Sequence, residues 1–105
     1  MEYTSEETAV FVRVISIMAI ADNEIEIRET KYFYEVMEEL EVSLYEKDLA
    51  GILSNEQVEQ ILKQMSKEMK IKLGQTAWKM MHVDGKMRVK EEDYYIYLLN
   101  TMGLL

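Results

Sequence analysis

Six acidic residues in two short segments have the type and spacing best suited to chemistry. In the first segment, an aspartate and two glutamates occupy alternate positions, and a third glutamate follows. In the second segment, an aspartate and a glutamate occupy the positions that correspond to the first and last of these. The six are Asp22, Glu24, Glu26, Glu29, Asp84 and Glu91. Hard cations such as Ca²⁺ or Mg²⁺ bind several converging carboxylate oxygens, so these residues are candidate ligands of a divalent cation. The alternative is that the aspartates bond nearby backbone N–H groups and the glutamates complement helix dipoles.

Catalytic constellations are scarce in this sequence. Cysteine is absent, His82 is the only histidine, and there is no glycine-rich phosphate loop. Nucleophilic triads, thiolate metal sites and nucleotide-dependent enzymes therefore lack their usual residues. His82 falls near the expected end of a helix, where a protonatable side chain complements the dipole. We expect a protein that is not an enzyme.

A second group of side chains suits contact with a protein. Tyr34, Glu35, Glu38 and Glu39 fall off the apolar stripe of one expected helix. An exposed tyrosine combines apolar area with a hydrogen-bonding tip, and carboxylates steer a basic partner. The alternative is an ordinary solvated helix face.

The composition predicts the elements that position these residues. The chain has 105 residues, 49% of them hydrophobic, with no proline and four glycines. That favours one all-α domain, 1–105, built as a compact bundle of about six helices. The expected helices cover about residues 5–21, 28–40, 44–53, 55–65, 67–83 and 90–102.

Helix starts and inward faces can also be read from the sequence. Thr4, Ser43, Ser54 and Ser66 are the expected N-caps, and the first three have a Glu or Gln three residues later. Helical spacing predicts an apolar contact face on 44–53 made of Leu44, Leu49, Ile52 and Leu53. Across the chain it predicts a buried set: Ile15, Met18, Val36, Leu40, Leu73, Ala77, Leu98 and Met102.

The sequence repeats itself without gaps at a shift of 62 residues. Asp22 then meets Asp84, and Glu29 meets Glu91. The apolar positions of the following helices also coincide. Each unit is thus a helix, a short loop and a second helix, and we expect the two hairpins to pack face to face.

This repeated pattern resembles the TerB-like family, which is named for a tellurite-resistance protein and is related to a helical domain of DnaJ-like co-chaperones. The copies read Asp-Asn-Glu-Ile-Glu-Ile-Arg-Glu over 22–29 and Asp-Gly-Lys-Met-Arg-Val-Lys-Glu over 84–91. The resemblance covers about residues 8–104. Asn23 departs from the family's usual glycine, and the second copy is basic where the family is often acidic.

The resemblance implies a fold, a setting and a ligand. It implies a pseudo-twofold pair of helical hairpins, a role in bacterial stress or defence response, and acidic residues that hold a divalent cation. It implies no enzymatic reaction. The function we expect is therefore a binding or regulatory module that works through protein contacts, with a cation-binding stress-response protein as the alternative.

Charge narrows the expected partners. The formal net charge is −8, made of −11 over residues 1–62 and +3 over 63–105. This balance argues against nucleic acid and anionic membrane surfaces and favours a basic protein partner. The resemblance implies a membrane-associated partner. No apolar run reaches the ~20 residues of a spanning helix, so we expect no direct membrane insertion. The first seven residues lack a secretory signal, which predicts a cytoplasmic protein.

Overall fold

The computed structural model is an all-α bundle, with six helices among the residues that it describes. The structure describes residues 3–19, 27–83, 85 and 89–105. The helices are α1 (Ser5–Ala19), α2 (Ile27–Glu39), α3 (Leu44–Ile52), α4 (Asn55–Gln64), α5 (Lys67–His82) and α6 (Val89–Met102). The expected fold class is confirmed. The expected end of the first helix, at 21 or 22, lies outside the described residues.

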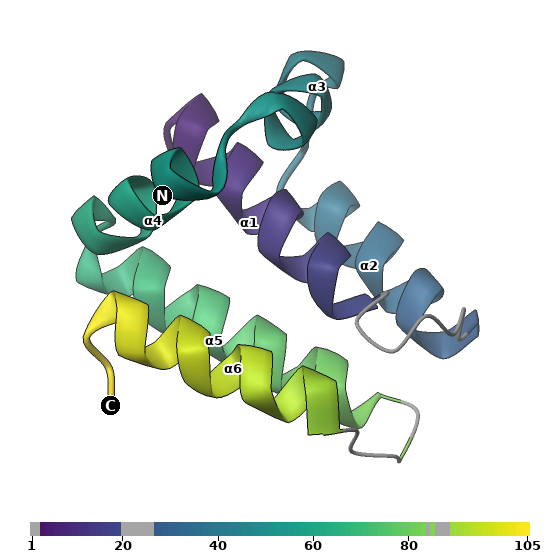
Figure 1. Cartoon of the computed structure of the whole chain (residues 1–105). Coiled ribbons are helices and arrows are strands. Elements are labelled where there is room, and N and C mark those ends of the chain that lie inside the picture. The colour runs from purple at the N-terminus through teal and green to yellow at the C-terminus, as the bar shows by residue number, and fades with distance from the viewer. Residues whose placement is uncertain (1–2, 20–26, 84, 86–88) are drawn as a thin grey trace.

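The bundle is organised around α1, as its nearly all-round apolar sequence predicts. This helix contacts α2, α3, α4 and α5, and Phe11, Ile15 and Met18 are fully buried in it. In Figure 1, α1 and α2 form one hairpin and α5 and α6 form another, while α3 and α4 lie at one end and connect the two. None of the described helices is long and apolar enough to cross a membrane.

Local capping chemistry fixes where four helices begin. The hydroxyl of Thr4 accepts from the Glu7 N–H at 3.0 Å, and the Glu7 carboxylate accepts from the Thr4 N–H at 3.1 Å. Ser43 and Ser54 form the same reciprocal pair with Glu46 and Gln57. Ser66 accepts from the Met69 N–H at 3.2 Å. All four predicted caps are confirmed, because each depends only on residues three apart.

The predicted core is mostly confirmed, with two corrections. Seven of the eight expected residues are buried, whereas Leu40 is half-buried because it lies just past the end of α2. The predicted contact face of α3 is wrong in part: Leu44 and Ile52 are 77% and 78% exposed. The helix instead faces the bundle with Ala50, which is buried.

The 62-residue repeat is visible in the helix bounds. The first hairpin has helices starting at 5 and 27, and the second has helices starting at 67 and 89. The helix ends match as well. Val42 N–H donates to the Met37 carbonyl at 3.1 Å, and Leu104 N–H donates to the Leu99 carbonyl at 2.9 Å. The register found in the sequence is therefore the register of the fold.

Candidate functional site

The expected cation ligands can be placed only in part. Asp22, Glu24, Glu26 and Asp84 lie outside the described residues. Glu29 and Glu91 are 1% and 0% exposed, in the first turns of α2 and α6. Among the residues that the structure describes, no three acidic or histidine side chains gather as a metal site. What the structure does bring out is that two glutamates, one in each hairpin, are buried at matching places.

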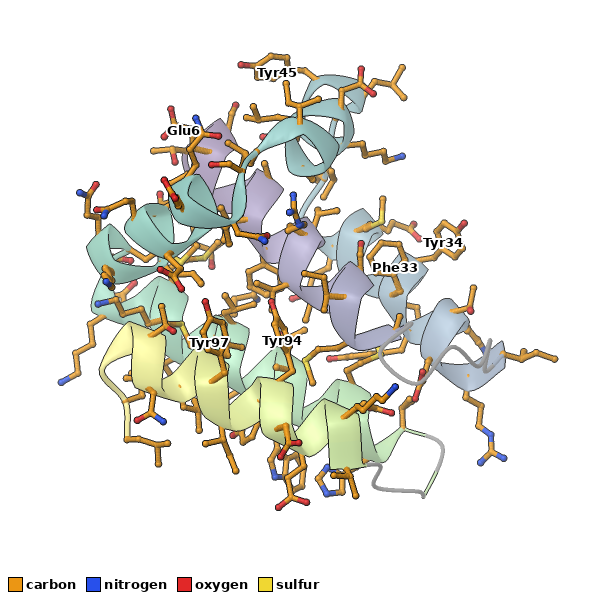
Figure 2. All side chains as sticks on the ribbon, viewed as in Figure 1. Glu6, Phe33, Tyr34, Tyr45, Tyr94 and Tyr97 are labelled. Atoms are coloured by element: carbon orange, nitrogen blue, oxygen red, sulfur yellow. The ribbon has the colours of Figure 1, made fainter. Side chains whose placement is uncertain are left out.

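The acidic face of α2 divides into two parts. Tyr34 is 62% exposed and lies beside the Phe33 ring, with 5.6 Å between ring centroids (Figure 2). Glu35 and Glu38 are also exposed. Glu39 is different, because its carboxylate accepts a hydrogen bond from Lys72 of α5 at 3.0 Å. Glu39 therefore also ties the two hairpins together.

Tyr32 shows how the α2 carboxylates act on a neighbour. Burial raises the pKa of Tyr32, and the carboxylates of Glu39 and Glu35 raise it further, whereas a hydrogen bond with Thr76 lowers it. Lys79 lies over the same ring, 5.3 Å from its centroid. The charges on this side of α2 are thus engaged with α5 as well as with solvent.

His82 is the last residue of α5, as expected. Its Nδ1 lies 2.8 Å from the carbonyl oxygen of Trp78, and its ring stacks on that indole with 4.1 Å between centroids. These contacts lie within one turn of its own helix. They give His82 a local structural role.

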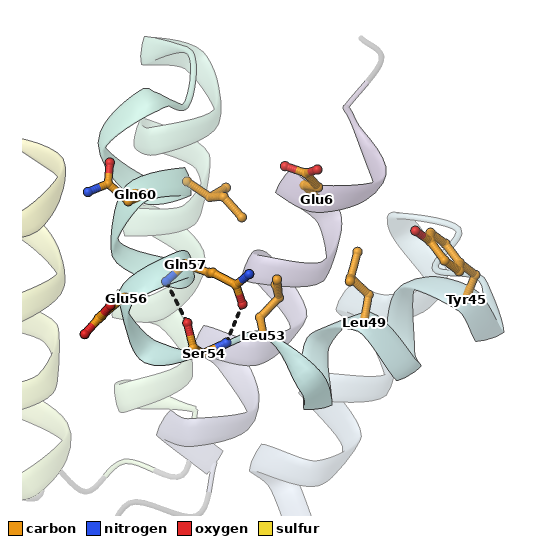
Figure 3. Close-up of a pocket in the computed structure, with 9 residues that line it drawn as sticks. Glu6, Tyr45, Leu49, Leu53, Ser54, Glu56, Gln57 and Gln60 are labelled. Carbon is orange, nitrogen blue, oxygen red and sulfur yellow. Dashed lines mark hydrogen bonds between the residues drawn. The ribbon is translucent and has the colours of Figure 1, made fainter.

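One hollow among the described residues is not predicted by the sequence. It is a groove of about 840 Å³ between the start of α1, α3 and α4 (Figure 3). Its apolar surface comes from Leu49, Leu53 and Ile61, and Tyr45 stands at one end with 65% of its surface exposed. Glu6 and Glu56 supply carboxylates at its edges. We call it the α1/α3/α4 groove.

One sequence signal could have revealed this groove. Tyr45, Leu49 and Leu53, which line the groove, follow one another at a helical spacing of four residues. The expected contact face of 44–53 includes Leu49 and Leu53 but not Tyr45. A helix of nine residues with more apolar side chains than one buried face can hold indicates an additional contact surface.

The Arg13 side chain holds in place the helices that form the groove. Its guanidinium donates to the carbonyls of Ala50 and Leu53 at 2.8 and 2.9 Å and to the Asn55 side chain at 3.1 Å. Those carbonyls lie at the end of α3, where a helix leaves acceptors without intrahelical partners. One side chain of α1 thus positions α3 relative to α4.

Two tyrosines of α6 hold the other side of α4. Tyr97 donates a short hydrogen bond to the Glu59 carboxylate. This hydrogen bond is the main reason that the pKa of Tyr97 is raised. The Tyr94 ring stacks on the Tyr97 ring, with 5.8 Å between centroids (Figure 2). Burial raises the pKa of Tyr94 to about 12. The helices that form the α1/α3/α4 groove are therefore held in place by side-chain contacts with other helices.

The comparisons with known proteins add no assignment. No protein-family model, no curated protein and no solved structure matches this chain. The function must therefore be argued from the geometry alone.

Proposed function

We propose that this protein is a non-enzymatic, TerB-like binding module that acts through protein contacts, in bacterial stress or defence response. The observation that carries the binding role is the α1/α3/α4 groove, with its apolar floor and acidic edges. The TerB-like assignment and the stress setting are supported by the sequence resemblance at 22–29 and 84–91.

The chemistry of the groove selects a class of partner. Leu49, Leu53 and Ile61 offer apolar area to a side chain that would otherwise stay in water. Glu6 and Glu56 favour positive charge beside that area, and residues 1–62 carry a net charge of −11. A helix whose apolar residues recur every three to four positions, with lysines alongside, fits both features. The proposed partner is thus a basic amphipathic segment of another protein.

A pair of designed peptides tests this proposal. Both carry the same amphipathic apolar pattern, but one has lysine and the other glutamate at the polar positions. We expect the lysine peptide to bind and to perturb amide resonances of Tyr45, Leu49 and Ile61 in NMR spectra. Tyr45→Ala should weaken binding by about tenfold, as expected for an aromatic anchor. Tyr34→Ala, which removes an exposed tyrosine of α2, is the matched control.

Equal binding of the two peptides would contradict the charge argument. Binding that Tyr45→Ala leaves unchanged but Tyr34→Ala weakens would move the site to the acidic face of α2.

A divalent-cation site is the second candidate, and the burial of Glu29 and Glu91 at matching places favours it. Carboxylate oxygens are the ligands that Ca²⁺ and Mg²⁺ prefer, and the repeat places one buried carboxylate in each hairpin. Of the two segments, 22–29 is the better host, because Lys86, Arg88 and Lys90 repel cations from the other.

Thermal unfolding tests the cation site. Millimolar Ca²⁺ or Mg²⁺ should raise the melting temperature, because a ligand that binds only the folded state stabilises it. Asp22→Asn should abolish the rise, while Asp48→Asn, the same charge change on exposed α3, should retain it. The absence of a shift with either cation would exclude this function and leave the peptide test unaffected.

A further inference from the structure

The two hairpins carry equivalent grooves that differ in what lies beside them. On the first hairpin, α3 closes one side of a groove with Ala50 and Gly51. The hairpin side of that groove is lined by Val12, Arg13, Ser16, Phe33, Tyr34 and Met37. The residues 62 positions after all of these except Tyr34 line a groove of about 370 Å³ on the second hairpin: Gly74, Gln75, Trp78, Tyr95 and Leu99. We call this the α5/α6 groove.

No helix among the described residues takes the place of α3 on the second hairpin. In the first hairpin, the chain passes from Val42 directly into α3. At the corresponding place, Leu104 lies over Gly74, where its side chain would be 3.8 Å from an added Cβ. The backbone geometry up to this point is the same in the two units. The α5/α6 groove thus has a position suited to a helix, and α3 shows how a helix lies there.

Two apolar side chains of the α5/α6 groove are larger than the residues 62 positions earlier. Ile71 is 41% exposed where the first hairpin has the buried Ala9, and Trp78 is 52% exposed where it has Ser16. Large apolar residues left in water at a concave site are typical of a contact surface. None of the side chains that line this groove is charged. Its complement is therefore an uncharged helix face.

We propose that the α5/α6 groove binds a short amphipathic helix of a partner protein, seated beside α5 as α3 is seated beside α1. The contact face of that helix carries a small residue, as α3 does with the buried Ala50. Its last carbonyls accept from the amide of Gln75, which stands where Arg13 stands in the first hairpin and likewise has N–H donors. This site is separate from the α1/α3/α4 groove and needs no basic partner.

The single tryptophan makes the proposal measurable. A synthetic peptide of residues 42–54, which contain α3 and no tryptophan, is titrated into the full chain up to millimolar concentration. Because isolated short helices are marginal in water, the same segment is also joined after Leu105, where the tether raises its effective concentration. Docking should move Trp78 emission to shorter wavelength and should persist at high salt.

Two matched variants decide the outcome. Ile71→Asp places a charge in the groove and should abolish the emission shift. Ile96→Asp changes an equally exposed isoleucine of α6 that does not line the groove, and it should retain the shift. Circular dichroism checks that both variants stay folded. Neither variant alters the α1/α3/α4 groove, so failure here would leave the peptide test of the proposed function standing.

Two results would overturn the proposal. One is an emission maximum that stays unchanged with both the free and the tethered segment, or a shift that Ile71→Asp does not remove. The other is concentration-dependent self-association, seen by analytical ultracentrifugation without any peptide and abolished by Ile71→Asp. That result would show that a second copy of the chain covers the groove.

Discussion

Arg13 links three helices through one guanidinium group. It lies on α1 and donates to two carbonyls at the end of α3 and to Asn55 at the start of α4. The sequence showed only a lone arginine within an apolar helix. Its role depends on residues some 40 positions away, so no local pattern could predict it.

Replacing Arg13 by Met should therefore destabilise the whole fold. The change keeps much of the apolar stem but leaves the carbonyls of Ala50 and Leu53 without their charged donor. We expect the free energy of unfolding to fall by about 1.5–3 kcal/mol, the usual range for hydrogen bonds to charged groups. Urea unfolding measures it. Arg13→Lys, which keeps the charge and one donor group, should lose less; an equal loss would show that charge and hydrogen bonding contribute nothing.

Tyr94 should make the protein sensitive to alkaline pH. Its pKa is about 12 in the folded chain, against 10.0 for an ordinary tyrosine, chiefly because it is buried. Between these values the unfolded chain loses the proton first, so rising pH favours unfolding. The stabilisation is complete below about pH 10 and declines towards about pH 12. The raised pKa values of Tyr97 and Tyr32 act in the same direction.

Tyr94→Phe should remove part of the loss of folding stability at alkaline pH. We expect the free energy of unfolding to decline less steeply above about pH 10, by up to about 1.4 kcal/mol per pH unit. Urea unfolding at a series of pH values measures the slope. Tyr34→Phe, which alters an exposed ring, should leave the slope as it is. Identical slopes for the wild type and Tyr94→Phe would contradict the assignment.

At the scale of elements, the second helix of each hairpin ends in the same left-handed turn. Gly103 has φ 74° after α6, and Glu41 has φ 53° after α2. An L residue in this conformation costs about 1–2 kcal/mol, whereas glycine adopts it freely. The same left-handed turn is therefore occupied by glycine in one unit and by a less suitable L residue in the other.

Three substitutions test this difference by thermal and urea unfolding. Gly103→Ala should destabilise by about 1–2 kcal/mol, although an added Cβ meets nothing within 4 Å. Glu41→Gly should stabilise by up to about 1 kcal/mol. Gly51→Ala is the control with the opposite sign, because Gly51 is helical and its Cβ also has open space, so alanine should stabilise. A Gly103→Ala variant that is as stable as the wild type would contradict the prediction that positive φ strains an L residue here.

The elements were largely predictable because their signals are local. Capping boxes span four residues and apolar stripes span one helix, so the six helices and most of the core could be read from the sequence. The exposed faces could not. Leu44 and Ile52 face solvent because α1 lies on the other side of α3, and that placement is a property of the assembled bundle.

At the scale of the whole molecule, the candidate site was missed for the same reason. The α1/α3/α4 groove joins residues from Glu6 to Ile61 on three helices. The sequence pointed instead to the acidic face of α2, where four candidates share one helix. In Figure 2, Tyr34 and Glu6 lie on different sides of the molecule. The range over which charges act can therefore show which of the two candidate surfaces binds the partner.

Salt dependence provides that separation. The longest dimension of the molecule is 32 Å. The Debye length is about 30 Å at 0.01 M salt and about 10 Å at 0.1 M. Charges on α2, which do not line the α1/α3/α4 groove, are therefore screened from a partner there more strongly as salt rises than Glu6 and Glu56, which line it.

We expect the double reversal Glu35→Lys and Glu38→Lys to slow association of the lysine peptide at about 0.01 M salt and to have little effect at about 0.1 M. Reversal of Glu6 and Glu56 should slow it at both concentrations. Glu39 is left unchanged, because its reversal would also break the contact with Lys72. Stopped-flow mixing measures the rates, with Glu68→Lys and Asp93→Lys, at exposed positions that do not line the groove, as a control of equal charge change. If the α2 reversals slow association equally at both concentrations, the partner binds beside Tyr34, and the hypothesis drawn from the sequence is the better one.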